Sequence, residues 1–254
     1  MNHVKKCVYT LFVFVVSINC ARSEQVKLVS GSNLTPDGEQ VVFSWRGDVW
    51  SGPSNGGRIT RLTAHAAADE YRCVSSDGKS IAFTSNRTGS EQTYKMSIDG
   101  GQPTQLTFHS EGTRPIGFTG NNQSLFVTGR RDHWFRWDTR YFTISATAPQ
   151  SGEQLLFDAY GAMAALSPDG KSVLFTREGM TWSRKGYTGS KASQIWLKHS
   201  DAEGYERIVG DDSDDCRYPV WAPDGESFYY VSEADGTRNI WSYRLKSQKR
   251  KQLT

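Results

Sequence analysis

Three things are scarce in this 254-residue sequence: cysteine, long apolar runs and an excess of charge of one sign. The formal net charge is +3, from 30 Lys and Arg against 27 Asp and Glu, and both signs are mixed along the chain. Such a balance gives no reason to expect a nucleic-acid partner. The apolar run at residues 7–18 is shorter than the roughly 20 residues of a membrane-spanning helix, so we expect no stable membrane span.

Catalytic and metal-binding motifs are also absent. The sequence has no GxSxG, no HExxH, no CxxC and no glycine-rich phosphate-binding loop. Serine and histidine are present, but no arrangement of them indicates a catalytic triad. We therefore predict no catalytic residue, no metal site and no cofactor in this chain.

The first 23 residues differ from the rest. Lys5 and Lys6 precede the apolar run, and Ala21-Arg22-Ser23 follows it as a small-x-small cleavage site. This pattern predicts a secretory signal peptide at residues 1–23 and export to the periplasm or the extracellular space. A lipid anchor on Cys20 is the alternative. Cleavage removes two of the four cysteines, and we expect the remaining Cys73 and Cys216, in distant repeats, to stay unpaired.

A short motif recurs five times in the remaining chain, as in LSPDGKSVLFT at residues 166–176. Each copy has a two-residue turn, Asp-Gly or Asn-Asn, followed by a β-rich run such as VLFTR or FYYVS. A tight hairpin of this kind is expected to place both turn residues in the left-handed region. The predicted turns are Asp37-Gly38, Asp77-Gly78, Asn121-Asn122, Asp169-Gly170 and Asp224-Gly225.

Two further segments complete each repeat: an aromatic strand such as QIWL, and a short strand that ends in Leu-Thr. Four short antiparallel strands every 40 to 55 residues are typical of an all-β fold of the β-propeller type. The expected blades span about 26–63, 64–107, 108–156, 157–209 and 210–254, within a propeller at 24–254. Five blades can form either an open ring or a closed ring of five blades. An all-β sandwich is the alternative fold.

Deviations from the repeat are the candidate binding residues, since insertions in repeat proteins fall on loops. The third and fourth repeats carry long segments rich in arginine and aromatic residues, both between the second and third strands. Arginine binds carboxylates bidentately, so we predict a peptide or protein ligand there; solvated arginines with aromatics packed between blades are the alternative. The candidate residues are Arg130, Arg131, Trp182, Arg184, Lys185 and Tyr187.

Other polar residues favour structural interpretations. His65 and His109 each follow a closing Leu-Thr by two positions, and recurrence in two repeats indicates an architectural role. The acidic run Asp211–Asp215 lacks the spacing of a calcium loop and is expected to be a solvated loop. The basic segment at residues 246–251 is expected to lie in a turn without a partner.

The motifs S-P-D-G-K at Ser167–Lys171 and S-I-D-G-G at Ser97–Gly101 resemble the propeller repeats of the Tol-system periplasmic protein and of tricorn-type peptidases. The long fourth-repeat segment is similar to an insertion of bacterial tricorn homologues. The resemblance covers residues 26–254. It implies a ring of six blades, of which five are visible, and adjacent arginines that anchor the carboxylate end of a substrate peptide, here Arg130 and Arg131.

This resemblance covers only the start of such a peptidase, whose second propeller, PDZ-like domain and serine-protease core have no counterpart here. It implies a non-catalytic segment of an exported peptidase that presents or gates peptides for a protease core. One alternative is a Tol-like scaffold that binds envelope proteins. The other is a small enzyme built from rim residues such as Asp132 and His133. An open blade edge would also favour self-association.

Overall fold

The computed structural model describes residues 25–132, 139–149, 151–179 and 185–254. These residues form nineteen strands joined by turns, and none of them is helical. Accordingly, no described segment is a helix long and apolar enough to span a bilayer. The all-β prediction is therefore confirmed for the described part of the chain.

Three of the blades are separate four-stranded antiparallel sheets in which each strand pairs with the next along the chain. The first comprises β1 Ser30–Leu34, β2 Gln40–Trp45, β3 Asp48–Pro53 and β4 Thr60–Arg61. The second comprises β5 Asp69–Val74, β6 Ser80–Thr88, β7 Ser90–Ser97 and β8 Thr104–Gln105. The fifth comprises β16 Arg217–Trp221, β17 Ser227–Ser232, β18 Asn239–Arg244 and β19 Lys249–Gln252.

The third and fourth blades share one long strand. The third consists of β9 Arg114–Phe118, β10 Ser124–Gly129, β11 Thr139–Ser145 and the first half of β12 Gln154–Leu166. The fourth consists of the second half of β12, β13 Ser172–Arg177, β14 Gln194–His199 and β15 Glu206–Val209. Pairing passes from β11 to β13 between Gly161 and Ala162, so the expected boundary near residue 156 falls inside a continuous strand.

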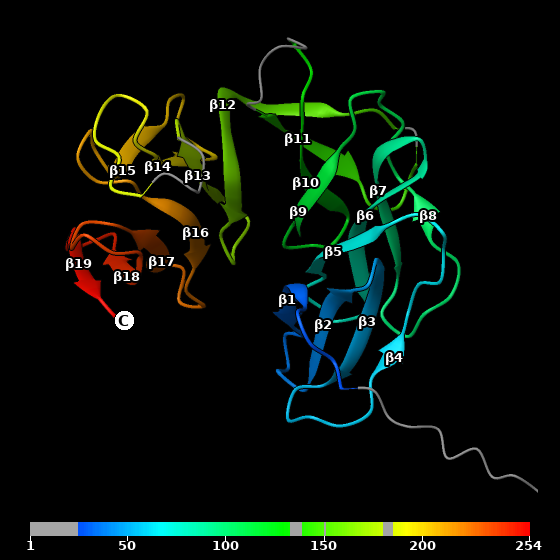
Figure 1. Cartoon of the computed structure of the whole chain (residues 1–254). Coiled ribbons are helices and arrows are strands. Elements are labelled where there is room, and N and C mark those ends of the chain that lie inside the picture. Colours follow the sequence, from blue (N-terminus) through cyan, green and yellow to red (C-terminus); the bar gives the residue numbers. More distant parts are fainter. Residues whose placement is uncertain (1–24, 133–138, 150, 180–184) are drawn as a thin grey trace, which may run out of the picture.

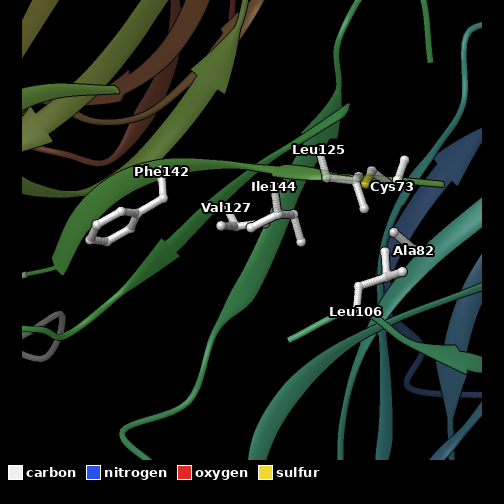
Figure 2. Close-up of a cluster of buried hydrophobic side chains, with 8 residues drawn as sticks. Cys73, Ala82, Leu106, Leu125, Val127, Phe142 and Ile144 are labelled. Atoms are coloured by element: carbon white, nitrogen blue, oxygen red, sulfur yellow. The ribbon is translucent and has the colours of Figure 1, made fainter. Parts of the chain in front are cut away.

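The blades follow one another around an arc, with the strands β1, β5, β9 and β16 on its inner side and the fifth blade separated from the first (Figure 1). Four clusters of buried apolar side chains lie between consecutive blades, one at each junction. Figure 2 shows the cluster between the second and third blades, where Cys73 and Ala82 meet Leu125 and Ile144. Consecutive blades thus bury the faces that they turn toward each other, as a propeller requires, and a sandwich is excluded.

The burial of equivalent residues in the five blades shows that the two end blades have uncovered faces. The fifth residue after each turn Asp or Asn faces the next blade, and it is fully or almost fully buried as Val42, Ala82, Phe126 and Leu174. Its equivalent in the last blade, Tyr229, is 40% exposed. The residue three positions before the turn faces the preceding blade, and Leu34 in the first blade is 56% exposed there. The outer faces of the end blades are therefore uncovered, so the ring is open.

The recurring turns differ from the predicted conformation. Only the second residue of each pair has a positive φ: 74° at Gly38 and 58° at Asn122, for example. The reason is the hydrogen bond from Gly38 N to Thr35 O (2.8 Å), which makes Pro36 and Asp37 the central residues and leaves glycine to follow them. The prediction that both residues are left-handed was wrong.

Candidate functional site

The antiparallel meander gives the arc two rims. The Asp-Gly and Asn-Asn turns join the first two strands of each blade and form one rim, here called the turn rim. Connections between the second and third strands lie at the opposite end, on the loop rim. Arg130 and Arg131 follow β10, and Lys185 and Tyr187 precede β14, so these four candidates belong to the loop rim. Trp182, Arg184 and His133 lie outside the described residues.

Arg131 is anchored inside the protein. Its Nε and Nη2 donate to the two carboxylate oxygens of Glu153, each at 2.8 Å. Its Nη1 donates to the carbonyl oxygens of Gly112 (2.9 Å) and Arg130 (2.6 Å), and Nη2 also donates to Thr113 Oγ1 (2.7 Å). A guanidinium has five N–H donors, so all are engaged, and the side chain is 10% exposed.

The same position in the second blade has the same role. The run Ser85-Asn86-Arg87 is equivalent to Gly129-Arg130-Arg131, since each begins at the same distance after its turn, at or near the end of the second strand. Arg87 Nη2 donates to both oxygens of the fully buried Asp69, at 2.9 and 2.8 Å. Arg87 lies 4.7 Å from the ring of Tyr94, and Arg131 lies 5.1 Å from that of Phe142. Aligning these two runs in the sequence indicates the structural role of Arg131.

An arginine over an aromatic ring is a feature of all five blades. In each blade the ring comes from the third strand, and the guanidinium carbon lies 4.7 to 6.0 Å from its centre. The pairs are Arg61–Trp50, Arg87–Tyr94, Arg131–Phe142, Arg177–Trp196 and Arg250–Trp241. Each pair lies within one blade, and Arg131, one of the residues predicted to bind a ligand, is therefore part of a recurring structural contact.

Arg130 lines a hollow of about 280 Å³ at the loop rim between the second and third blades. Arg114, Glu91 and Glu111 line it too, together with several serines and threonines. Arg114 Nε donates to Glu91 Oε2 (2.6 Å), and this hydrogen bond raises the pKa of the arginine. The hollow is polar and carries charges of both signs, which suits a peptide backbone and its end groups.

The fourth-blade segment is attached to the fifth blade. Gly186 N donates to Glu233 Oε2 (2.7 Å), and Arg238 Nε binds Glu233 Oε1 (2.7 Å). The lining of the Arg130 hollow includes neither Lys185 nor Tyr187. The structure thus divides the described candidates between two places on the loop rim.

The acidic run at residues 211–215 is partly buried, so the expectation of a solvated loop was wrong for its second half. Asp215 binds the guanidinium of Arg217 (3.0 and 2.9 Å) and accepts from Ser193 N (2.8 Å). Burial works against the charged carboxylate, but the Arg217 and Ser193 hydrogen bonds keep the pKa of Asp215 below its usual value. Asp214 pairs with Arg250 (2.9 Å), so the basic segment has a partner as well.

The histidines predicted to be architectural have matching contacts. His65 Nδ1 accepts from Ala67 N (3.0 Å), and His109 Nδ1 accepts from Glu111 N (3.1 Å). Both close the turn between one blade and the next. The recurrence of the position was therefore a correct guide to a structural role.

The remaining polar candidates have structural contacts. His199 Nδ1 lies 2.8 Å from Ser172 Oγ, but serine recurs at this position in Ser80, Ser124 and Ser227, and no described carboxylate pairs with His199. Asp132, proposed for a rim enzyme, pairs with Arg140 and accepts from Tyr160 Oη (2.8 Å). Among the described residues no group of three His, Cys, Asp or Glu could hold a metal ion.

The fold defines a class of protein, an open β-propeller built of four-stranded blades. Within that class, a family model described as the tricorn protease N-terminal beta propeller domain matches residues 32–254, and the chain belongs to this family. Tricorn protease homolog 1 of Streptomyces coelicolor is 27% identical over 217 residues, 82% of this chain and 19% of the relative. The tricorn protease homolog of Saccharolobus solfataricus is 21% identical over 223 residues, 85% of this chain and 20% of the relative.

Two solved structures share the fold. A putative TolB from Agrobacterium tumefaciens has a TM-score of 0.71 and 20% identity, and the match covers 89% of this chain and 80% of that one. A tricorn protease has a TM-score of 0.71 and 18% identity, covering 89% of this chain and 22% of that one. The chain spans about a fifth of the length of the curated relatives that it matches.

Proposed function

We propose that this chain is the non-catalytic propeller segment of an exported tricorn-like serine peptidase and presents or gates peptides for a protease core. The observation that carries the proposal is membership of the tricorn N-terminal propeller family over residues 32–254. The chain accounts for about a fifth of its curated relatives, so a protease core, in the same polypeptide or a separate one, is the partner.

In this proposal Arg130 receives the carboxylate end of the peptide in the polar hollow of the loop rim. Arg131 fixes the position of the Arg130 backbone, because it donates to the Arg130 carbonyl oxygen and is itself held by Glu153, Thr113 and Gly112. The arginine doublet thus divides into one residue that binds and one that positions. The hollow has room for the end of a peptide, and its hydroxyl groups satisfy backbone polar groups.

The second candidate function is a Tol-like scaffold that binds another envelope protein. It is favoured by the likeness to the putative TolB structure, of which the match covers 80%. Such a scaffold would show no preference for peptides with a free carboxyl end. The open ring supports either function, since the end blades expose apolar faces at Leu34 and Tyr229.

Peptide binding separates the two candidates. We expect short peptides with a free carboxyl end to bind at least about tenfold more tightly than their amides, because a charge-assisted pair with Arg130 is lost. Arg130→Ala should abolish this preference. Arg46→Ala is the matched control, since Arg46 occupies the equivalent place in the first blade. Equal affinity for acid and amide in the unmodified protein would contradict peptide anchoring and favour the scaffold.

Export and the protease core have tests of their own. Mass spectrometry of the protein recovered from the cell envelope or the medium should find a mature chain that starts at Glu24. An uncleaved chain that still carries residues 1–23 and is found in the cytoplasm would contradict export. Reading the gene beyond the codon for Thr254 should reveal a PDZ-like segment and a serine-protease core, in the same frame or in a neighbouring one.

A further inference from the structure

A small apolar cavity opens on the turn rim, where the chain departs from its own repeat. The cavity has a volume of about 190 Å³ between the third and fourth blades. Its apolar walls are formed by Phe126, Leu156, Phe157, Leu166 and Val173. It lies at the opposite end of the blades from the Arg130 hollow, and nothing in the proposed function uses it.

At the cavity, Lys198 stands where three other blades have a large side chain packed in an inter-blade cluster. The position is defined by strand pairing. In each of these blades, the first apolar residue of the second strand pairs with a residue of the third strand, and that third-strand residue faces the preceding blade. In the second, third and fifth blades this residue is Met96, Ile144 or Tyr243, each packed in an inter-blade cluster. Ile144 is visible in Figure 2 among the side chains that fill the neighbouring junction. The fourth blade has Lys198, paired with Val173, at this position.

Lys198 turns its charge away from the junction. Its Nζ donates to the carbonyl oxygens of His199 (3.0 Å) and Ala202, at the surface turn after β14. Only the aliphatic part of the Lys198 side chain is left in the space that Met or Ile would occupy. Phe126, Phe157 and Val173, each less than 10% exposed, form the apolar floor of the cavity.

Two lysines stand at the edge of this cavity. Lys171 follows the Asp169-Gly170 turn and lines the cavity with Lys198. Lys171 is exposed, and its charge is attracted by Asp169. Lys198 has three N–H donors and uses two on carbonyl groups, which leaves one for a ligand. The cavity thus combines an apolar interior with cationic groups at its opening.

We propose that this cavity binds a compact apolar carboxylate: one aromatic ring or a branched aliphatic group, with its acid group at Lys171 and Lys198. The volume supports a ligand of this size, since an apolar cavity of about 150 Å³ holds a benzene molecule. Buried apolar contact supplies the affinity, and the lysines select an acid over a neutral analogue. The acid can be a free small molecule or the carboxy-terminal residue of a peptide.

The probe is 3-phenylpropionate, titrated into the full propeller chain and followed by NMR chemical-shift changes. We expect binding with shifts at the residues that line the cavity, and at least about tenfold weaker binding of 3-phenylpropanamide, which has the same ring but no charge. A tripeptide that ends in a free phenylalanine is the second arm. Shifts at the cavity residues with both probes identify chain ends as ligands, and shifts there with the small acid alone identify a free metabolite.

Lys198→Met is the decisive variant, because it restores the residue of the second blade and fills the cavity. It should abolish binding of 3-phenylpropionate and raise the melting temperature. Lys171→Gln keeps the cavity and should weaken the acid about tenfold while leaving the amide unchanged. Lys246→Gln, at an exposed turn lysine, should bind 3-phenylpropionate as the unmodified chain does. The proposal is overturned if the unmodified chain does not bind the acid, or if Lys198→Met binds it equally well.

Discussion

Arg131 and Glu153 form a two-point ion pair between the end of β10 and the start of β12, with both N–O distances at 2.8 Å. The arginine is 10% exposed and the glutamate 20%. Removing one member leaves the other charge partly buried without its partner, which is strongly destabilising. The contact therefore belongs to the framework of the third blade.

We predict that Arg131→Ala lowers the free energy of unfolding by about 3 kcal/mol, the usual cost of breaking a buried pair. Arg130→Ala, one residue away at the rim, should cost less than about 1 kcal/mol. Urea unfolding of the two variants measures the difference. Similar losses in both would contradict the division of roles between the two arginines.

The fold was predictable because its signals are local. Turn residues such as Asp169-Gly170, and the β-rich runs that follow them, fix the hairpins within a few positions of sequence. The turn conformation was misjudged because Thr35 O, two residues before Asp37, accepts the closing hydrogen bond and shifts the turn by one residue. Counting repeats gave five blades, but the sequence does not show that the ring is open. The structure shows this through the exposure of Leu34 and Tyr229 and the separation of the end blades (Figure 1).

The site was less predictable because partners come from different places in each repeat. Arg131 pairs with a glutamate 22 residues later, and its equivalent Arg87 pairs with an aspartate 18 residues earlier. Comparison of the two runs predicts that Arg131 is structural but not which residue it binds. Similarly, Asp214 is buried by contacts with Ser232 and Arg250, which only the folded blade brings near.

The uncovered face of the fifth blade allows a matched comparison of packing. Phe126 and Tyr229 are repeat-equivalent, and the first is 1% exposed while the second is 40% exposed. We predict that Phe126→Ala costs about 3 to 5 kcal/mol of unfolding free energy, because it leaves a cavity in a filled junction. Tyr229→Ala should cost less than about 1 kcal/mol. A large cost at Tyr229 in the isolated chain would show that its face is covered in solution.

Exposed apolar faces at both ends of the arc favour association of the chain with itself. Val220 and Tyr229 on one end, and Leu34 on the other, are each at least 40% exposed. We predict a concentration-dependent increase in mass by sedimentation, reversed by Leu34→Glu or Tyr229→Glu. Lys246→Glu, in the exposed turn between β18 and β19, is the control. A monomer at all concentrations would contradict self-association and leave both faces to a further partner.

The two cysteines of the described chain, Cys73 and Cys216, are buried and do not form a disulfide with each other. Burial, followed in size by the charge of Asp214, raises the pKa of the Cys216 thiol well above its ordinary value. Because the thiolate is the reactive form, we predict that neither cysteine of a chain lacking residues 1–23 reacts with a thiol reagent under native conditions. Two thiols should react after denaturation. Reaction of the folded protein would show that the junctions open locally.

The turn aspartates make folding stability depend on pH. Hydrogen bonds hold the pKa values of these carboxyls below their ordinary range. The main donors are the Thr35 hydroxyl at Asp37, the Ser75 hydroxyl at Asp77, the Ser167 hydroxyl at Asp169 and the Glu226 amide at Asp224. A carboxyl with a lower pKa in the folded state stabilises the fold above the unfolded pKa, about 3.9. This contribution is lost as the pH falls through the folded value.

The third blade provides the control, since Asn121 takes the same place and accepts from the Thr119 hydroxyl (2.9 Å) without titrating. We predict that Asp77→Asn folds normally and loses less melting temperature than the unmodified chain between pH 5 and pH 2. Asn121→Asp should lose more over the same interval, because it adds a carboxyl that must be protonated on acidification. Circular dichroism melting at each pH measures both slopes. Parallel curves for all three proteins would mean that these turns bind no additional proton on unfolding. Acid sensitivity would then be attributed to other carboxyls, such as Asp215, whose burial works against the charged form but whose hydrogen bonds with Arg217 and Ser193 keep its pKa below the ordinary value.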